Sequence, residues 1–164
     1  MTAAPVKTFT PALRSRPYGH RYLRAGRVVL IALVTLLVPS LLGLAIIAGA
    51  SFRYVASDFD NPWTVISTIG GILLLAPVYG IFLVPFGLLL GAWAMRWGLA
   101  GWVYALGTAV ALPMGIGALF GASDPTLEAW QAGVVLVPVT ISHAAVMWMA
   151  TRLLCPDALL DPLP

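Results

Sequence analysis

His143 is the ionisable side chain that falls inside a long apolar run of this sequence, and Thr140 and Ser142 flank it. An ionisable group inside a bilayer costs free energy unless a partner or a cavity compensates, so such a residue is a candidate functional site. A neutral imidazole can instead be satisfied by hydrogen bonds between helices. Candidate partners within this chain are Tyr79, Tyr104, Ser40, Thr108 and Gln131, of which Gln131 lies at an unfavourable depth. The sequence leaves both roles open, structural and functional.

Haem ligation and nucleophilic catalysis each lack a partner for His143. His20 lies outside the apolar runs, and Met147 shares the helix face of His143, so neither reaches the opposite side of an iron. Met114 or a residue of another subunit is the remaining candidate ligand. Ser142 adjoins His143, but adjacent helical residues point about 100° apart, which separates a nucleophile from its base. We expect no catalytic residue and no cofactor.

The carboxylates lie outside the apolar runs, which argues against two further kinds of function. Intramembrane aspartyl hydrolysis and ion-coupled transport both use acids at membrane depth. Asp58, Asp60, Asp124 and Glu128 lie in the outer loops or at the very start of the fourth run, and loop and helix-cap roles account for the three aspartates. We expect no metal site there, because the ligand spacing of metal loops is missing.

Composition places the chain in a bilayer. Hydrophobic residues make up 60% of the 164 residues and charged residues only 9%, a balance that excludes a water-soluble globular surface. The net charge of +3 comes from basic residues near the N-terminus, which membrane orientation explains without nucleic acid. The single Cys155 excludes an internal disulfide and a CxxC site within one chain.

The apolar runs predict an all-α polytopic membrane protein, an up-down bundle with four transmembrane helices. Each run is long enough to cross a hydrocarbon core of roughly 30 Å. We place the spans at about 27–50, 62–95, 99–121 and 126–154 within a transmembrane domain of residues 27–154. A basic cytoplasmic segment, residues 1–26, precedes this domain, and a short irregular cytoplasmic tail, residues 155–164, follows it.

Prolines and glycines interrupt these runs. The second run is longer than a crossing requires, so it must tilt, kink or begin as an interfacial turn. Gly70, Gly71, Pro77 and Pro85 offer positions to bend. A proline deep in each run favours either hinges for a transport cycle or a compact bundle whose neighbours satisfy the freed carbonyls.

Small residues at four-residue spacing predict helix-packing faces, because they let membrane helices approach closely. Gly87 and Gly91 form one such face in the second run. Gly107, Ala111 and Gly115 form another in the third run.

Basic residues predict the orientation. Arg96 lies between the second and third runs, Arg152 ends the fourth, and Arg53 alone falls on the opposite side. By the positive-inside rule both termini are cytoplasmic. Contacts with anionic lipid headgroups are expected from Arg14, Arg16, Arg21, Arg24 and Arg27.

The first apolar run is longer than the roughly 7 to 15 residues of a signal-peptide core, so we expect an uncleaved anchor. A multi-pass protein of the bacterial inner membrane is the preferred location. The arginine-rich, acid-free start keeps the mitochondrial inner membrane open.

The stretch at residues 53–55, Arg-Tyr-Val, and residues 62–64, Pro-Trp-Thr, resembles the end of the first helix in the small membrane subunits of tripartite periplasmic transporters. Members of that family have four helices, inside termini and a similar length. Val65 and Ile66 stand where the family places paired glutamates. The resemblance therefore supports no assignment and is one form of a transport hypothesis.

The preferred hypothesis is a non-catalytic accessory or assembly subunit of a larger inner-membrane complex, because packing faces are extensive and no catalytic set is complete. Its expected partners are the lipid bilayer and either other membrane subunits or further copies of the chain. The alternative is a membrane subunit of a small-molecule transporter with a midplane site near His143.

Overall fold

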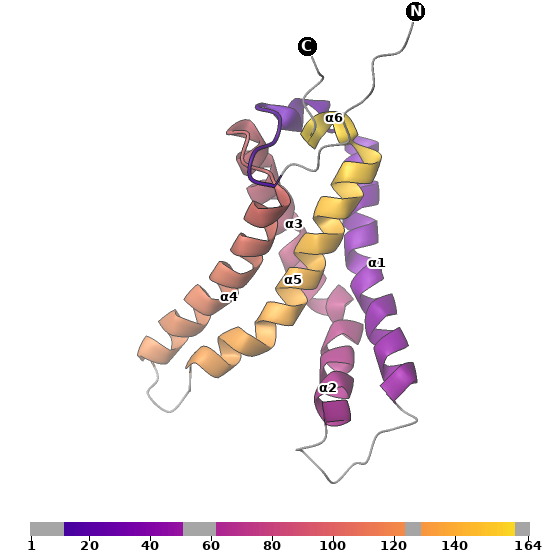
Figure 1. Cartoon of the computed structure of the whole chain (residues 1–164), viewed down its shortest axis with the longest axis vertical. Coiled ribbons are helices and arrows are strands. Elements are labelled where there is room, and N and C mark those ends of the chain that lie inside the picture. Colours follow the sequence, from indigo (N-terminus) through magenta and orange to yellow (C-terminus); the bar gives the residue numbers. More distant parts are fainter. Residues whose placement is uncertain (1–11, 51–61, 124–128, 160–164) are drawn as a thin grey trace, which may run out of the picture.

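The computed structural model describes residues 12–50, 62–123 and 129–159, with their side chains except at 120–123 and 129–135 (Figure 1). Every regular element in these ranges is a helix, which confirms the all-α class. The long helices are α1 (Ala25–Ala50), α2 (Pro62–Leu74), α3 (Ala76–Arg96), α4 (Trp102–Ser123) and α5 (Ala129–Leu154). Two short helices are η1 (Gly19–Tyr22) and α6 (Pro156–Leu159).

Three segments are long and apolar enough to cross a membrane: α1, α3 and residues Trp102–Leu119 of α4. They indicate a membrane-embedded protein. The predictions made for Arg53, Asp58, Asp60, Asp124 and Glu128 concern positions outside the described residues.

The run predicted as one span at 62–95 is two helices, because the chain breaks at Leu75. Pro77 has no N–H, so it cannot donate to the carbonyl of Leu73 four residues earlier. Two hydroxyls bind carbonyls beside the break. The Tyr79 hydroxyl donates to the Ile72 carbonyl at 2.5 Å, and the Ser40 hydroxyl of α1 donates to the Leu74 carbonyl at 3.2 Å. Pro77 thus marks the break, as one of the predicted bending positions.

Helices α1 and α2 form one hairpin whose backbones meet at glycines. A Cβ added to Gly43 would lie 2.5 Å from the Leu74 backbone nitrogen and 2.6 Å from the Gly70 carbonyl oxygen. Only a glycine permits this approach, since backbone atoms of α2 cannot move aside. Gly70 therefore lies at a helix crossing, whereas the chain breaks five residues later.

Helices α4 and α5 form a second hairpin, and a hydroxyl repairs its proline. Pro113 removes the N–H that would bind the Ala109 carbonyl, and the Thr140 hydroxyl of α5 donates to that carbonyl at 2.5 Å. The ends of this hairpin and of the α1–α2 hairpin diverge at the lower edge of the molecule (Figure 1).

Helices α3 and α4 are adjacent in the sequence but have almost no contact with each other. The short connection predicted between the second and third spans therefore does not bring this pair of helices into contact. Helix α3 contacts α1 and α5, while α4 contacts α5. The short turn that joins α3 to α4 fixes only their near ends, so the helices diverge from it (Figure 1).

Residues 12–24, here called the strap, cross the end of the bundle where the chain turns from α3 to α4. The Ser15 backbone donates to the Gly98 carbonyl at 2.8 Å, and the Arg16 backbone donates to the Leu159 carbonyl at 3.2 Å. The Ala100 backbone donates to the Ser15 hydroxyl at 3.0 Å. The predicted basic segment is therefore packed on the bundle from residue 12 onward.

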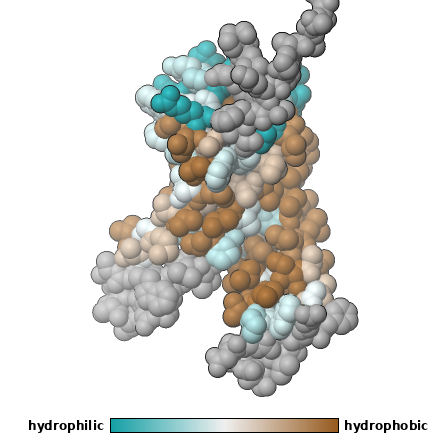
Figure 2. Space-filling model, viewed as in Figure 1, coloured by the Kyte–Doolittle hydropathy of each residue, from teal (hydrophilic) through white to brown (hydrophobic). Residues whose placement is uncertain are grey.

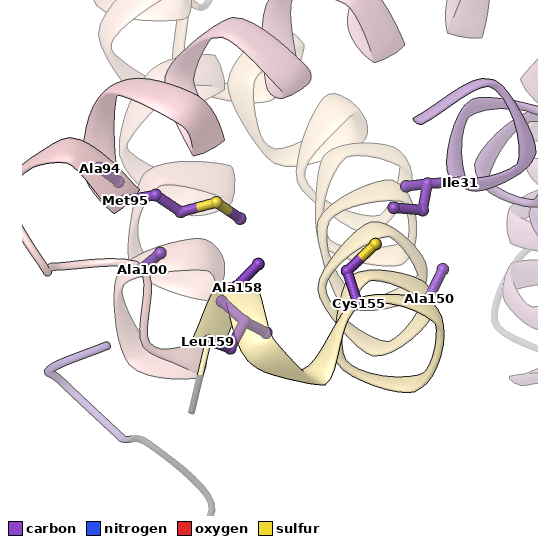
Figure 3. Packing of buried hydrophobic residues seen from close by; sticks show 8 residues of the cluster. All are labelled: Ile31, Ala94, Met95, Ala100, Ala150, Cys155, Ala158 and Leu159. Atoms are coloured by element: carbon purple, nitrogen blue, oxygen red, sulfur yellow. The ribbon is translucent and has the colours of Figure 1, made fainter. Parts of the chain in front are cut away.

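The predicted irregular tail is also partly wrong, because its residues 156–159 form α6. Ala158 and Leu159 are buried beside Met95 of α3, in a core cluster that also includes Ile31 of α1 (Figure 3). Cys155 is buried in the same cluster. Hydrophilic residues gather at this end of the surface, and hydrophobic residues cover the helices below it (Figure 2). We call this end the arginine end.

Candidate functional site

His143 is 5% exposed and lies on α5 opposite α3. Its Nδ1 is 2.8 Å from the Val139 carbonyl oxygen, which can only accept, so Nδ1 carries the proton. Nε2 is then an acceptor; it is buried and has no hydrogen-bond partner among the described residues. A Cβ added to Gly80 of α3 would lie 3.2 Å from Nε2. The absence of a side chain at Gly80 makes room for the imidazole.

The polar residues expected around His143 bind backbone carbonyls instead. Thr140 donates to Ala109, as described above, and the Ser142 hydroxyl donates at 2.8 Å to the Val139 carbonyl that also accepts from His143. Tyr79 donates to Ile72 across the α2–α3 break. None of these contacts joins a hydroxyl to the imidazole. Ser142 therefore does not face His143 as a nucleophile would.

A cavity of about 320 Å³ lies between α3 and α4, with α5 as its floor. Its wall on α3 includes Gly87 and Gly91, and its wall on α4 includes Ala105 and Ala109. His143 is part of the floor. The cavity exists because α3 and α4 diverge.

Hydroxyl groups that line this cavity donate to the backbone of their own helices or of a neighbour. Thr35 donates to Ile31 at 2.7 Å, Thr108 to Tyr104 at 2.9 Å and Thr151 to Met147 at 2.7 Å. Thr140 and Tyr79, which also line it, donate to carbonyls already named. The side chain of Tyr104 belongs to the same wall and is half-buried. The lining is consequently largely hydrocarbon in character, with Tyr104 and the Nε2 atom of His143 as its further polar groups.

The predicted packing glycines differ in their surroundings. A Cβ on Gly87 would meet the Met147 side chain of α5 at 3.0 Å, so this residue does pack against another helix. Gly91, Gly107 and Gly115 have nothing within 4 Å of such a Cβ, and Ala111 is exposed. Gly91, Gly107 and Gly115 therefore face open space in the described chain, and the packing role of these three glycines and of Ala111 stays a prediction.

Helix α4 packs on α5 through a different small-residue face. Ala109, Pro113 and Gly117 are buried, and they are offset by two residues, roughly 200° around the helix, from the face of Gly107. The four-residue spacing alone identified the Gly107 face of α4, which is exposed. Pro113 on α4 and Thr140 on α5 mark the other face, through which α4 packs on α5.

Among the arginines expected at lipid headgroups, two donate hydrogen bonds within the protein and the other three are exposed. The Arg16 guanidinium donates to the Tyr22 hydroxyl at 2.6 Å and lies 4.0 Å from the centroid of that ring. The Arg27 guanidinium donates to the Leu154 carbonyl at 2.8 Å, which ties α1 to the end of α5. Arg14, Arg21 and Arg24 are exposed at the same end.

Several structural residues were missed by the sequence analysis. Gly98 has a φ of 69° and ends α3 in the left-handed conformation that glycine favours. Gly19 and Gly101 pack against the carbonyls of Ala158 and Ala12, where a Cβ would clash. Gly98 and Gly101 at the α3–α4 turn indicate in the sequence that another segment approaches the turn closely. The sequence does not show which segment this is.

Within the part of the chain that the structure describes, no three His, Cys, Asp or Glu side chains form a group that could hold a metal ion. The chain matches no protein-family model, no curated protein and no solved structure. The helices themselves define its class as a helical, membrane-embedded protein.

Proposed function

We propose that this protein is a non-catalytic accessory or assembly subunit of a larger complex in the bacterial inner membrane. The supporting observation is the open face of Gly107, Ala111 and Gly115 on α4. The opposite face of α4 already packs on α5 through buried small residues, so the open face is a second surface of the same chemistry without an intramolecular partner. Small residues of this kind promote close helix contacts in lipid.

Copurification with a matched control tests this function. The protein is extracted from membranes in mild detergent as wild type, as Gly107→Leu and Gly115→Leu, and as Gly49→Leu. Gly49 is also exposed, with nothing within 4 Å of an added Cβ, but lies on α1. We expect one stoichiometric partner, another membrane subunit or a second copy, that is lost from both α4 variants and kept with Gly49→Leu. A partner retained equally by all variants would contradict the proposal.

The proposed topology has four spans, with α2 and α3 together as the second, and cytoplasmic termini. The arrangement of charge supports it. Arg96 ends α3 and Arg152 lies in the last turn of α5, and the strap contacts this same end of the bundle. Arginines concentrated at one end favour its cytoplasmic placement. A mitochondrial inner membrane has the same charge rule and remains the alternative location.

A membrane subunit of a small-molecule transporter is the second candidate, and the cavity lined by His143 favours it. Because the lining threonines donate to carbonyls, a substrate there would have to be largely apolar. Uptake of such a substrate by reconstituted vesicles, abolished by His143→Gln and His143→Ala alike, would favour this candidate. Uptake unaffected by both substitutions would exclude a site at His143.

A further inference from the structure

The cavity between α3 and α4 opens sideways, toward the surface that a bilayer would cover. Phe82 and Phe86 of α3 line it and are 78% and 50% exposed. Ile116 and Leu112 of α4 line it from the other side and are also exposed. An occupant can therefore enter from the lipid phase without an opening through either end of the bundle.

The lining selects an apolar occupant. Side-chain hydroxyls of Thr35, Thr108 and Thr140 already donate to carbonyls, and the unpartnered Nε2 of His143 is buried beside Gly80. A polar ligand would lose hydrogen bonds to water and find few donors here. A hydrocarbon chain has no hydrogen bonds to water and so loses none on entering the cavity.

The size of the cavity suits a small or flexible occupant. Its volume of about 320 Å³ lies at the lower end of the range for small-molecule pockets, about 300 to 1,000 Å³. A single flexible chain fits this space.

Positive charge near the arginine end favours an occupant that carries an anionic group at that end of the cavity. Ala94, Met95 and Trp148 line the cavity near the arginine end. Arg96 follows Met95 and is exposed, and the Arg152 guanidinium lies 5.6 Å from the Trp148 ring centroid. In the described ranges only Asp157 supplies an opposing carboxylate. An anionic headgroup is therefore favoured over a neutral one at this end.

We propose that the cavity binds one acyl chain of an anionic phospholipid, whose headgroup lies at the arginine end beside Arg96. The chain fills the space that α3 and α4 leave as they diverge and covers the apolar side chains of both walls. This site is separate from the open face of α4, so it does not depend on a partner subunit.

Lipid retention by purified protein tests the site. Wild type, Gly91→Leu and Gly49→Leu are purified from bacterial membranes in mild detergent, and bound phospholipid is identified by native mass spectrometry. Gly91 lines the cavity and has room for a side chain, so leucine there occupies the space of the chain. We expect about one phosphatidylglycerol or other anionic phospholipid per wild-type and Gly49→Leu protein, and at least a tenfold loss in Gly91→Leu. Equal retention in Gly91→Leu would overturn the proposal.

Two further measurements keep the test independent of how Gly91→Leu folds. Phosphatidylglycerol with a photoreactive diazirine in its acyl chain should crosslink to residues 82–92 and 105–116 more strongly than to the exposed face of α1 at residues 33–44. Uniform labelling would mean that only bulk lipid contacts the walls. Arg96→Gln should reduce the preference for phosphatidylglycerol over phosphatidylcholine about fivefold, equivalent to about 1 kcal/mol per surface arginine. An unchanged preference would overturn the headgroup assignment.

Discussion

At the scale of single residues, hydroxyls and prolines act as pairs in this bundle. Pro113 leaves the Ala109 carbonyl without a backbone donor, and Thr140 of the neighbouring helix supplies one. Near Pro77, the hydroxyls of Ser40 and Tyr79 bind the Leu74 and Ile72 carbonyls, which lie just before the Leu75 break. A carbonyl in hydrocarbon needs such a partner because no water is available. The polar side chains in the spans are thus explained first by their hydrogen bonds to helix carbonyls, and only then by any chemical role.

Thr140→Val should destabilise the α4–α5 hairpin by about 1 kcal/mol, in line with hydrogen bonds measured in membrane proteins. The reason is the loss of the only side-chain donor that contacts the Ala109 carbonyl among the described residues. Unfolding in detergent measures the free energy. In a Pro113→Ala background the backbone N–H of residue 113 replaces the hydroxyl, so Thr140→Val should cost much less. The same cost in both backgrounds would contradict the pairing.

His143→Gln should be tolerated, and His143→Ala should cost only about 1 kcal/mol through the loss of a hydrogen bond. Glutamine keeps a donor and much of the volume that fits beside Gly80. Expression level and thermal unfolding of the purified protein measure both variants. If glutamine removes an activity or a visible absorption band while the fold stays intact, His143 is a functional centre.

At the scale of helices, the sequence predicted where apolar runs begin and end but not which of their faces meet. Pro77 among the predicted bending positions does mark the break between α2 and α3. The separation of α3 from α4 was not predictable, because a short turn restricts the near ends of two helices and leaves the far ends free. The choice between the faces of Gly107 and Ala109 depends on the position of α5, which the spacing within α4 does not contain.

Gly43→Ala should destabilise the α1–α2 hairpin by about 1 to 3 kcal/mol, because the added methyl would overlap backbone atoms of Leu74 and Gly70. Thermal unfolding of detergent-solubilised protein checks the effect. Gly49→Ala, in the same helix with open space around it, should leave the midpoint unchanged. Equal midpoints for wild type and Gly43→Ala would show that this crossing is looser than the structure places it.

At the scale of the whole molecule, the bundle is closed at the arginine end and open at the other. The strap, the α3–α4 turn and α6 share backbone hydrogen bonds there, and the core cluster of Ile31, Met95 and Leu159 lies beneath them (Figure 3). The sequence predicted the charge of this end but not that the terminal segments pack on the bundle. Their packing depends on contacts between residues more than a hundred positions apart, such as Arg16 with Leu159, which no local pattern encodes.

Gly101→Leu should release the strap, because a side chain there would overlap the Ala12 carbonyl. We expect faster protease cleavage within residues 12–24 and a lower thermal midpoint, with membrane insertion retained. Leucine at the exposed Gly26, where nothing lies within 4 Å of an added Cβ, serves as the control. Cleavage at the same rate in both variants would mean that the strap is held without this contact.

Membrane topology tests the central claim most directly, because the partner face and the lipid site both require a bundle that crosses the bilayer with its arginine end in the cytoplasm. Reporters that are active only in one compartment are fused after Arg96 and after Pro164, and inserted near Asp58. The account predicts cytoplasmic signals from the first two positions and an outer-compartment signal from Asp58. A cytoplasmic signal at Asp58, or an outer signal after Arg96, would contradict the orientation and with it the headgroup site at the arginine end.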